Sequence, residues 1–310
     1  MDDALKPIPA RGRTLGRLGG VIVAAMIIAC VGSLPYTFGR AGDVAGSGGA
    51  RRFEQTRPDH AMLPPSWARH KADERAQVVS IAQKEGRAPR PLLGTDRLGR
   101  SIAVRVLAGG GISLAVGFSA AMMAVLIGTL YGTIAGWAGG RIDSVMMRLV
   151  DILYGLPYIL LVVLLAVAAG GLIDRGNEVG ASSAGILAWI GRHREIVNIV
   201  TLLIAIGVPL PRQFLRHLLP NLLGPIIVYA TLTVPSAILS ESFLSFLGIG
   251  VQEPLPSWGN LAATGLSELN IVRARWWLLV FPCATIAITL LALNFLGEGL
   301  RERFDPKRVK

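Results

Sequence analysis

The segment Gly94–Ser101 has the residue spacing in this chain that most resembles a nucleotide-binding loop. Its sequence, GTDRLGRS, fits the pattern of a phosphate-binding P-loop except that Arg100 replaces the lysine that reaches the terminal phosphates. A P-loop follows an apolar β-strand, whereas sequence rich in Arg, Gly and Pro precedes this segment. We therefore predict no nucleotide site here. We predict a turn at Gly94, with Thr95 or Asp96 capping a short interfacial helix.

No other group of residues has the spacing of a catalytic or metal-binding site. The histidines stand apart along the chain: His60, His70, His193 and His217. Glu241 is the most suggestive carboxylate, because the 23 residues before it carry no charge. Ionisable groups inside a membrane usually face protein or water. Glu241 could therefore line a pore or interface, or be hydrogen-bonded to a neighbouring helix near the outer surface. We predict no enzymatic activity, no cofactor and no metal.

The composition indicates a membrane protein. The chain has 310 residues, of which 52% are hydrophobic and 16% charged, against about 25% charged in soluble domains. The net charge of +11 does not predict nucleic-acid binding, because no basic stripe is interleaved with exposed aromatic residues. Cys30 and Cys283 lie in apolar runs, where cysteine behaves as a small hydrophobic residue.

Five long uncharged runs predict membrane-spanning helices, which need about 20 apolar residues each. These runs are 18–39, 106–140, 152–173, 218–240 and 276–297. A weaker apolar stretch, 196–210, would reach only about 22 Å as a helix, whereas the hydrocarbon core is about 30 Å thick. We therefore predict an all-α polytopic membrane protein with about six transmembrane helices and a shortened fourth.

The distribution of Lys and Arg predicts the orientation. With the N-terminus inside, the short inner segments hold thirteen Lys and Arg residues and the short outer loops hold five, as the positive-inside rule requires. The first apolar run is then an uncleaved span and not a signal peptide. The predicted organisation is a cytoplasmic tail (1–18), a first transmembrane helix (19–38), an external segment (39–105), a transmembrane core (106–299) and a cytoplasmic tail (300–310).

Several passages, in a fixed order, resemble the second permease of oligopeptide and dipeptide importers of the ATP-binding-cassette (ABC) superfamily. They cover most of 93–306: Leu93–Ser101, Asp151–Tyr158, Leu215–Asn221, Ala237–Gly250, Pro256–Gly259, Asn294–Arg301 and Asp305-Pro306. The resemblance implies a type I ABC importer permease fold in the inner membrane of a bacterium. It implies a translocation path shared with a second permease subunit, two cytoplasmic ATP-binding subunits and an external solute-binding protein. The chain itself would carry no ATP chemistry.

One departure from the family pattern concerns the cytoplasmic loop that couples the permease to its ATPase. Gly207 matches the glycine of the family motif, but Thr201, Leu202 and Leu203, which belong to an apolar run, occupy the positions of its Glu-Ala-Ala signature. The rest of the predicted coupling loop is a remnant: Gly207, Arg212, Arg216, His217, Leu219 and Pro220. Two explanations stay open. One is a deletion of roughly 30 residues of the family pattern, namely the inner half of the fourth span and the first half of the coupling loop; the other is a natural short span that thins the bilayer.

The leading hypothesis is therefore a permease subunit of an ATP-driven, binding-protein-dependent peptide importer. The alternatives are a permease of the same family for nickel or a peptide-like antibiotic, or a remnant that cannot couple to an ATPase. A secondary transporter would show inverted repeats and paired ionisable residues at the membrane midplane. The sequence shows neither.

Overall fold

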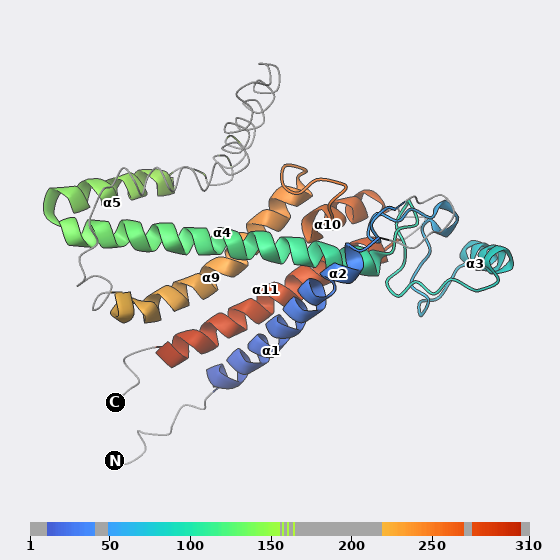
Figure 1. Ribbon diagram of the computed structural model, residues 1–310, viewed down its shortest axis with the longest axis horizontal. Coiled ribbons are helices and arrows are strands. Elements are labelled where there is room, and N and C mark those ends of the chain that lie inside the picture. The colour runs from blue at the N-terminus through green and yellow to red at the C-terminus, as the bar shows by residue number, and fades with distance from the viewer. Residues whose placement is uncertain are drawn as a thin grey trace, which may run out of the picture. The chain divides into compact units, whose positions relative to one another are not determined.

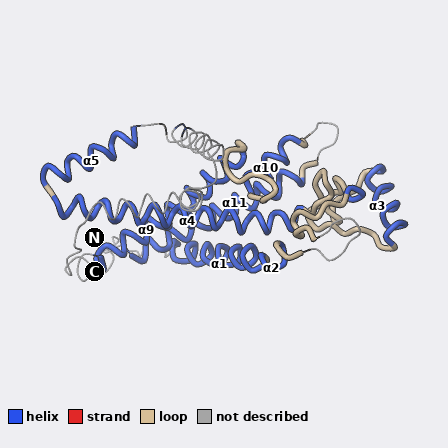
Figure 2. Tube along the Cα trace, turned by 45° about the horizontal axis from the view of Figure 1, so that its top comes forward, coloured by secondary structure: helices blue, strands red, loops and turns tan. Residues whose placement is uncertain are grey.

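The computed structural model describes residues 11–40, 49–155, 157, 160, 164, 219–269 and 275–304. The elements in these residues are α1 (Arg11–Gly32), α2 (Leu34–Thr37), the 3₁₀ helix η1 (Pro58–His60), α3 (Ala72–Glu85), α4 (Ile102–Ala138), α5 (Gly140–Gly155), α9 (Leu219–Phe246), α10 (Trp258–Ser267) and α11 (Trp277–Phe304) (Figures 1 and 2). Isolated bridges, and no β-strand, occur in the described residues. The all-α prediction is confirmed.

Within the described residues, four helices are long and apolar enough to cross a membrane: Thr14–Thr37, Ile102–Ala138, Ile226–Phe246 and Trp277–Arg303. They confirm the spans predicted from the first, second, fourth and fifth uncharged runs. The predicted span at 152–173 lies mostly outside the described residues, and the shortened span at 196–210 lies wholly outside them. The 37 residues of α4 extend for roughly 55 Å at 1.5 Å per residue, which exceeds the thickness of the hydrocarbon core.

The chain divides into two compact units, one formed by Met1–Met122 with Ile227–Lys310 and the other by Met123–Ile226. In the second unit, the turn between α4 and α5 is made by Gly139 and Gly140, whose φ angles are +59° and +54°. Glycine adopts these left-handed angles without a steric penalty. The Tyr131 hydroxyl then donates to the carbonyl of Met146 at 2.8 Å, which ties the two helices together.

In the first unit, α1 packs closely along α11 because glycines stand at their contact. A Cβ on Gly16 would lie 2.6 Å from the Cα of Gly299, and a Cβ on Gly19 would lie 2.7 Å from the backbone nitrogen of Leu296. Small residues let membrane helices approach to backbone contact, where van der Waals packing replaces the hydrophobic driving force. The glycines of α1 therefore determine how closely the first span joins the core.

Trp258 is the centre of the packing around α10. Its side chain is fully buried, and its indole N–H donates to the carbonyl of Val106 at 3.0 Å. Gly110 on α4 leaves room for the indole ring and for the sulfur of Cys30. Of the two cysteines in apolar runs, Cys30 is buried, whereas Cys283 is exposed on the surface of α11. Both cysteines are free thiols.

Candidate functional site

The predicted coupling-loop residues fall at the edge of what the structure describes. Gly207, Arg212, Arg216 and His217 lie outside the described residues. Leu219 and Pro220 begin α9, and their side chains lie outside the described part as well. The coupling loop therefore stays a prediction.

Glu241 is buried in the C-terminal part of α9. Its carboxylate accepts hydrogen bonds from the hydroxyls of Ser245 at 2.8 Å and Ser242 at 3.3 Å. The hydroxyl oxygen of Ser245 also accepts from the backbone N–H of Val251 at 2.9 Å. The described hydrogen bonds of the carboxylate are thus to its own helix, and not to a neighbouring helix as one interpretation had it. A role in the translocation path stays a prediction.

The segment before α4 forms the predicted turn, but the short helix predicted there is wrong. Gly94 and Gly99 have φ angles of +85° and +73°, and α4 begins only at Ile102. One oxygen of the Asp96 carboxylate accepts from the backbone N–H groups of Leu98 at 2.9 Å and Arg100 at 2.8 Å. Because the second glycine holds a left-handed conformation that helices avoid, Asp96 stabilises a tight turn and caps no helix.

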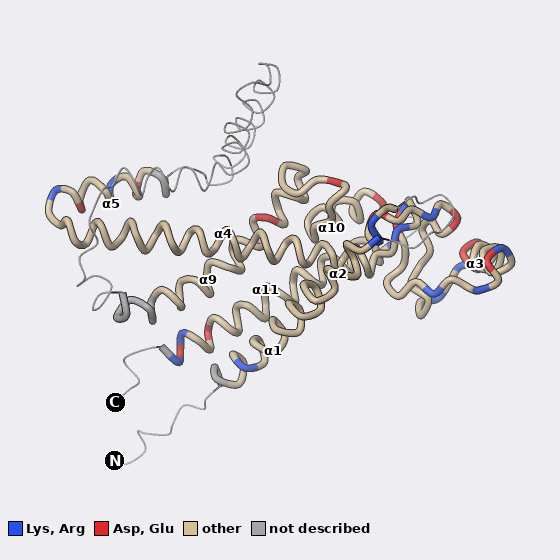
Figure 3. Tube along the Cα trace, in the orientation of Figure 1, with Lys and Arg blue, Asp and Glu red and all other residues tan. Residues whose placement is uncertain are grey.

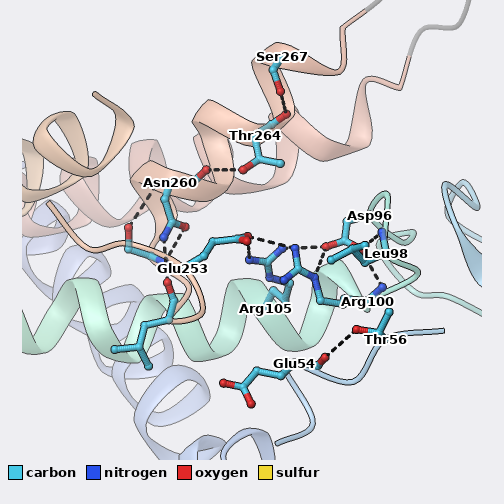
Figure 4. Close-up of polar contacts among 12 residues, drawn as sticks. Glu54, Thr56, Asp96, Leu98, Arg100, Arg105, Glu253, Asn260, Thr264 and Ser267 are labelled. Carbon is cyan, nitrogen blue, oxygen red and sulfur yellow. Dashed lines mark hydrogen bonds and ion pairs between the residues drawn. The ribbon is translucent and has the colours of Figure 1, made fainter. Parts of the chain in front are cut away.

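The same aspartate is the centre of an ionic cluster, which consists of the buried side chains of Asp96, Arg100 and Arg105 and the half-exposed Glu253 (Figure 4). The other Asp96 oxygen accepts from Nε of Arg100 at 2.6 Å and from Nη1 of Arg105 at 2.8 Å. Glu253, in the loop between α9 and α10, accepts from the same two arginines at 3.1 and 2.8 Å. Each arginine therefore bridges two carboxylates from parts of the chain about 150 residues apart.

Burial makes the ionic cluster sensitive to the loss of any member. The side chains of Arg105 and Asp96 are 1% and 4% exposed, whereas that of Glu253 is 51% exposed. Burial raises the pKa of Glu253, but the hydrogen bonds and positive charges of Arg105 and Arg100 outweigh it and hold the pKa below its ordinary value. A buried charge without its partner is strongly destabilising. The ionic cluster therefore joins the α9–α10 loop to the beginning of α4.

Thr95 connects this turn to the segment between α2 and α3 and to α11. Its hydroxyl donates to the carbonyl of His60 at 2.5 Å and accepts from the backbone N–H of Leu63 at 2.8 Å. Its carbonyl accepts from the indole N–H of Trp277 at 3.3 Å. The His60 ring in turn contacts the carboxylate of Glu85 on α3 at 2.8 Å.

The ionic cluster has the chemistry of a structural contact between two segments of the chain. Both arginines are occupied by carboxylates, and no group of three or more His, Cys, Asp or Glu side chains that could hold a metal occurs among the described residues. Sequence reasoning singled out Asp96 and Arg100 but missed Arg105 and Glu253. A signal for Arg105 was present, since it is the last charge before the longest uncharged run. No comparable signal marks Glu253.

The comparisons with known proteins agree with this architecture. The family of inner membrane components of binding-protein-dependent transport systems matches residues 128–310, which is more than half of the chain. The chain belongs to this family. Members of the family are the permeases of ABC importers and work with ATPase and binding-protein partners. This permease is accordingly a multi-pass protein of the inner membrane, in keeping with the four helices of membrane-spanning length in the described part of the chain.

Curated relatives cover most of the permease. It is 46% identical over 224 residues to the dipeptide transport system permease protein DppC of Bacillus subtilis, covering 69% of this chain and 68% of the relative. It is 45% identical over 224 residues to the oligopeptide transport system permease protein OppC of Escherichia coli K12, covering 69% and 72%. The di/tripeptide transport system permease protein DppC of Pseudomonas aeruginosa is 33% identical over 299 residues, covering 94% and 88%.

Proposed function

We propose that this chain is a permease subunit of an ATP-driven, binding-protein-dependent importer of peptides. The observation that carries the proposal is the family match combined with relatives that are named for dipeptide, oligopeptide and di/tripeptide transport. None of these three names mentions nickel or an antibiotic, so peptides are favoured over the alternative solutes. In this proposal the chain forms part of the translocation path, and the external binding protein supplies most of the affinity for the peptide.

A second permease subunit completes the path in this proposal. Three glycines four residues apart, Gly128, Gly132 and Gly136, share one face of α4, and a Cβ on any of them would meet no atom within 4 Å. Glycines at this spacing favour close contact between membrane helices. The glycines of α1 already have such a contact with α11, whereas these three glycines of α4 have none among the described residues. This α4 face therefore suits a helix of another subunit.

The topology proposed for this permease places both termini in the cytoplasm and the segment 39–105 outside. The distribution of Lys and Arg in the short segments supports it. Cysteine-labelling of single-cysteine variants in intact cells tests it. We expect a membrane-impermeant reagent to label the Arg87→Cys variant in intact cells. Labelling of this variant only after the cells are permeabilised would contradict the proposed topology.

The ATP chemistry of the importer belongs to the partner ATPase and not to this permease. The segment that resembles a P-loop supports this view, because its Arg100 is bound by Asp96 and Glu253 and is not available for a phosphate. We expect the purified chain to show no saturable nucleotide binding. Binding that disappears in a Gly99→Ala, Arg100→Gln double variant would contradict this expectation.

Coupling to the ATPase depends on the remnant loop that includes Gly207, Arg212 and Arg216. Arg212 and Arg216 are four residues apart and would share a helical face, which suits an acidic patch on the ATPase. We expect weak coupling in the chain as it stands, and recovery when a loop of family length is inserted between Gly207 and Val208. Full stimulation of ATP hydrolysis by loaded binding protein in the unaltered complex would show that the short loop is sufficient.

Uptake by the assembled importer tests the peptide proposal directly. The chain would be produced with its companion permease, ATPases and binding protein in a bacterial strain without its own peptide permeases. Uptake of radiolabelled di- and oligopeptides is expected, and it should be lost when this chain alone is omitted. Uptake of nickel without uptake of peptides would assign the permease to the alternative solute class.

A further inference from the structure

A cavity of about 580 Å³ lies between the N-terminal end of α1 and the C-terminal end of α11. Gly16, Arg17 and Gly20 line it from α1. Leu296, Gly299, Leu300 and Arg303 line it from α11. Its size is in the range of small-molecule sites, about 300–1,000 Å³. Its lining combines two cations with an apolar wall, which suits an amphipathic anion.

The glycines create this cavity. Gly16 and Gly299 bring the two helix axes to backbone contact, which places the arginine of each helix beside the same space. A Cβ on Gly20 would meet only the end of the Leu296 side chain, at 3.5 Å. The space beside Gly20 is therefore open, whereas the space beside Gly16 is filled by backbone.

The carboxylates near the end of α11 point away from Arg303 to different degrees. At about 100° per residue, Arg303 lies about 40° from Gly299 and about 60° from Leu300 around the helix, whereas Glu302 lies about 100° and Glu298 about 140° from Arg303. Neither Arg17 nor Arg303 forms an ion pair with any carboxylate among the described residues. The cavity therefore presents two exposed cations without a described anionic partner from this chain.

The position of the cavity identifies the kind of anion. Arg17 is near the start of the Thr14–Thr37 span, and Arg303 ends the Trp277–Arg303 span, so both stand at the same boundary of the apolar region. Figure 3 shows basic residues at these neighbouring ends of α1 and α11. At this depth the abundant anions are the phosphates of lipid headgroups, and basic pockets between membrane helices bind them.

We propose that this cavity binds the headgroup of an anionic phospholipid. The guanidinium groups of Arg17 and Arg303 donate to the phosphate oxygens, for which the planar fork of arginine is well suited. Leu296 and Leu300 contact the first carbons of the acyl chains. The bound lipid would connect the first span to the last span, and this role is independent of the solute that the permease carries.

Lipid binding to the purified permease, in its complex or alone, tests the proposal. Native mass spectrometry and thermal unfolding in a neutral detergent would compare added phosphatidylglycerol, phosphatidylcholine and inorganic phosphate. We expect retention of phosphatidylglycerol and a raised midpoint of unfolding with that lipid alone. The Arg17→Gln, Arg303→Gln double variant should bind it at least tenfold more weakly, and Arg141→Gln, which changes an exposed arginine on α5, should bind as the unaltered protein does.

A charge-neutral variant separates the cavity from general attraction to positive charge. Gly20→Leu extends an apolar side chain into the cavity and keeps both arginines, so it should also lose phosphatidylglycerol retention. The midpoint of thermal unfolding of the Gly20→Leu protein without added lipid shows whether this variant folds. Equal binding of phosphatidylglycerol and phosphatidylcholine, or an unchanged affinity in the double variant, would overturn the proposal. Arginine-dependent binding of inorganic phosphate without binding of the lipid would overturn it too.

Discussion

Two pairs of arginines in the first unit meet opposite surroundings. Arg100 and Arg105 are buried and share two carboxylates of the same chain. Arg17 and Arg303 are exposed at the cavity between α1 and α11 and have no described carboxylate partner. The difference indicates that Arg100 and Arg105 stabilise the folded chain, so their removal should destabilise it. The second pair is available to something outside the chain, so its removal should affect binding and leave the fold intact.

The largest effect is expected for Arg105→Met. The variant leaves the buried carboxylate of Asp96 with one arginine in place of two and frees Glu253 from its shorter bond. Breaking a buried ion pair by removing one partner costs about 3–5 kcal/mol, so the yield of folded protein and the midpoint of thermal unfolding in detergent should both fall. Arg87→Met, at an exposed arginine between α3 and α4, is the matched control. Equal stability of the two variants would refute the structural role of the ionic cluster.

The next largest effect is expected at the contact between α1 and α11, which brings Arg17 and Arg303 beside the same cavity. Gly16→Val would force side-chain atoms into the backbone of Gly299, and overpacking of this kind costs about 1–3 kcal/mol. Phosphatidylglycerol retention should fall as well, because α1 can no longer approach α11. Gly20→Ala is the control, since its Cβ meets only an ordinary contact at 3.5 Å. A Gly16→Val protein that unfolds at the same midpoint as Gly20→Ala would show that the close approach is dispensable.

A smaller effect is expected from the titration of Glu253. Its pKa is lower in the folded protein than its ordinary value of 4.5, so its contribution to stability is present above that ordinary pKa and is lost as the pH falls through the lower folded value. Because the carboxylate is half exposed, the contribution is about 1 kcal/mol or less. Unfolding midpoints measured between pH 3 and pH 7 should show a steeper loss on acidification for the unaltered protein than for Glu253→Gln. If the unfolding midpoints of the two proteins depended on pH in the same way, Glu253 would make no ionic contribution to stability.

The smallest effect is expected for the Arg17→Gln, Arg303→Gln double variant in neutral detergent without lipid. Surface substitutions of this kind change the free energy of unfolding by about 0.5 kcal/mol or less. Thermal unfolding should therefore match that of the unaltered protein. A large loss of stability in this lipid-free condition would mean that both arginines have structural partners, and the contrast between the two pairs would disappear.

The spans were predictable because their signal is local. A helix that crosses a membrane needs a continuous apolar run, and the runs at 18–39, 106–140, 218–240 and 276–297 correspond to helices of the structure. The turn at Gly94 was predictable for a similar reason, since glycine favours the left-handed conformation found there. The helix expected after it was wrong because the Asp96 carboxylate binds backbone N–H groups of a turn just as it would those of a helix end.

The ionic cluster was only half predictable because its members come from separate parts of the chain. Asp96 and Arg100 are in one short passage, but Glu253 follows Arg105 by 148 residues, and nothing in a single sequence pairs residues at such a distance. Trp277 shows the same limit. Its place at the start of the last apolar run suggests a side chain at the lipid surface, whereas the structure buries it against Thr95.

The separation between Arg105 and Glu253 also orders the biogenesis of the permease. A ribosome makes Arg105 and its near neighbour Asp96 long before it makes Glu253, so the arginine depends on Asp96 alone while the following spans enter the membrane. The bond to Glu253 forms only after α9 has been threaded and its C-terminal loop has emerged on the same side as the beginning of α4. The complete ionic cluster can therefore exist only in chains whose α9–α10 loop lies on the same side of the membrane as the beginning of α4.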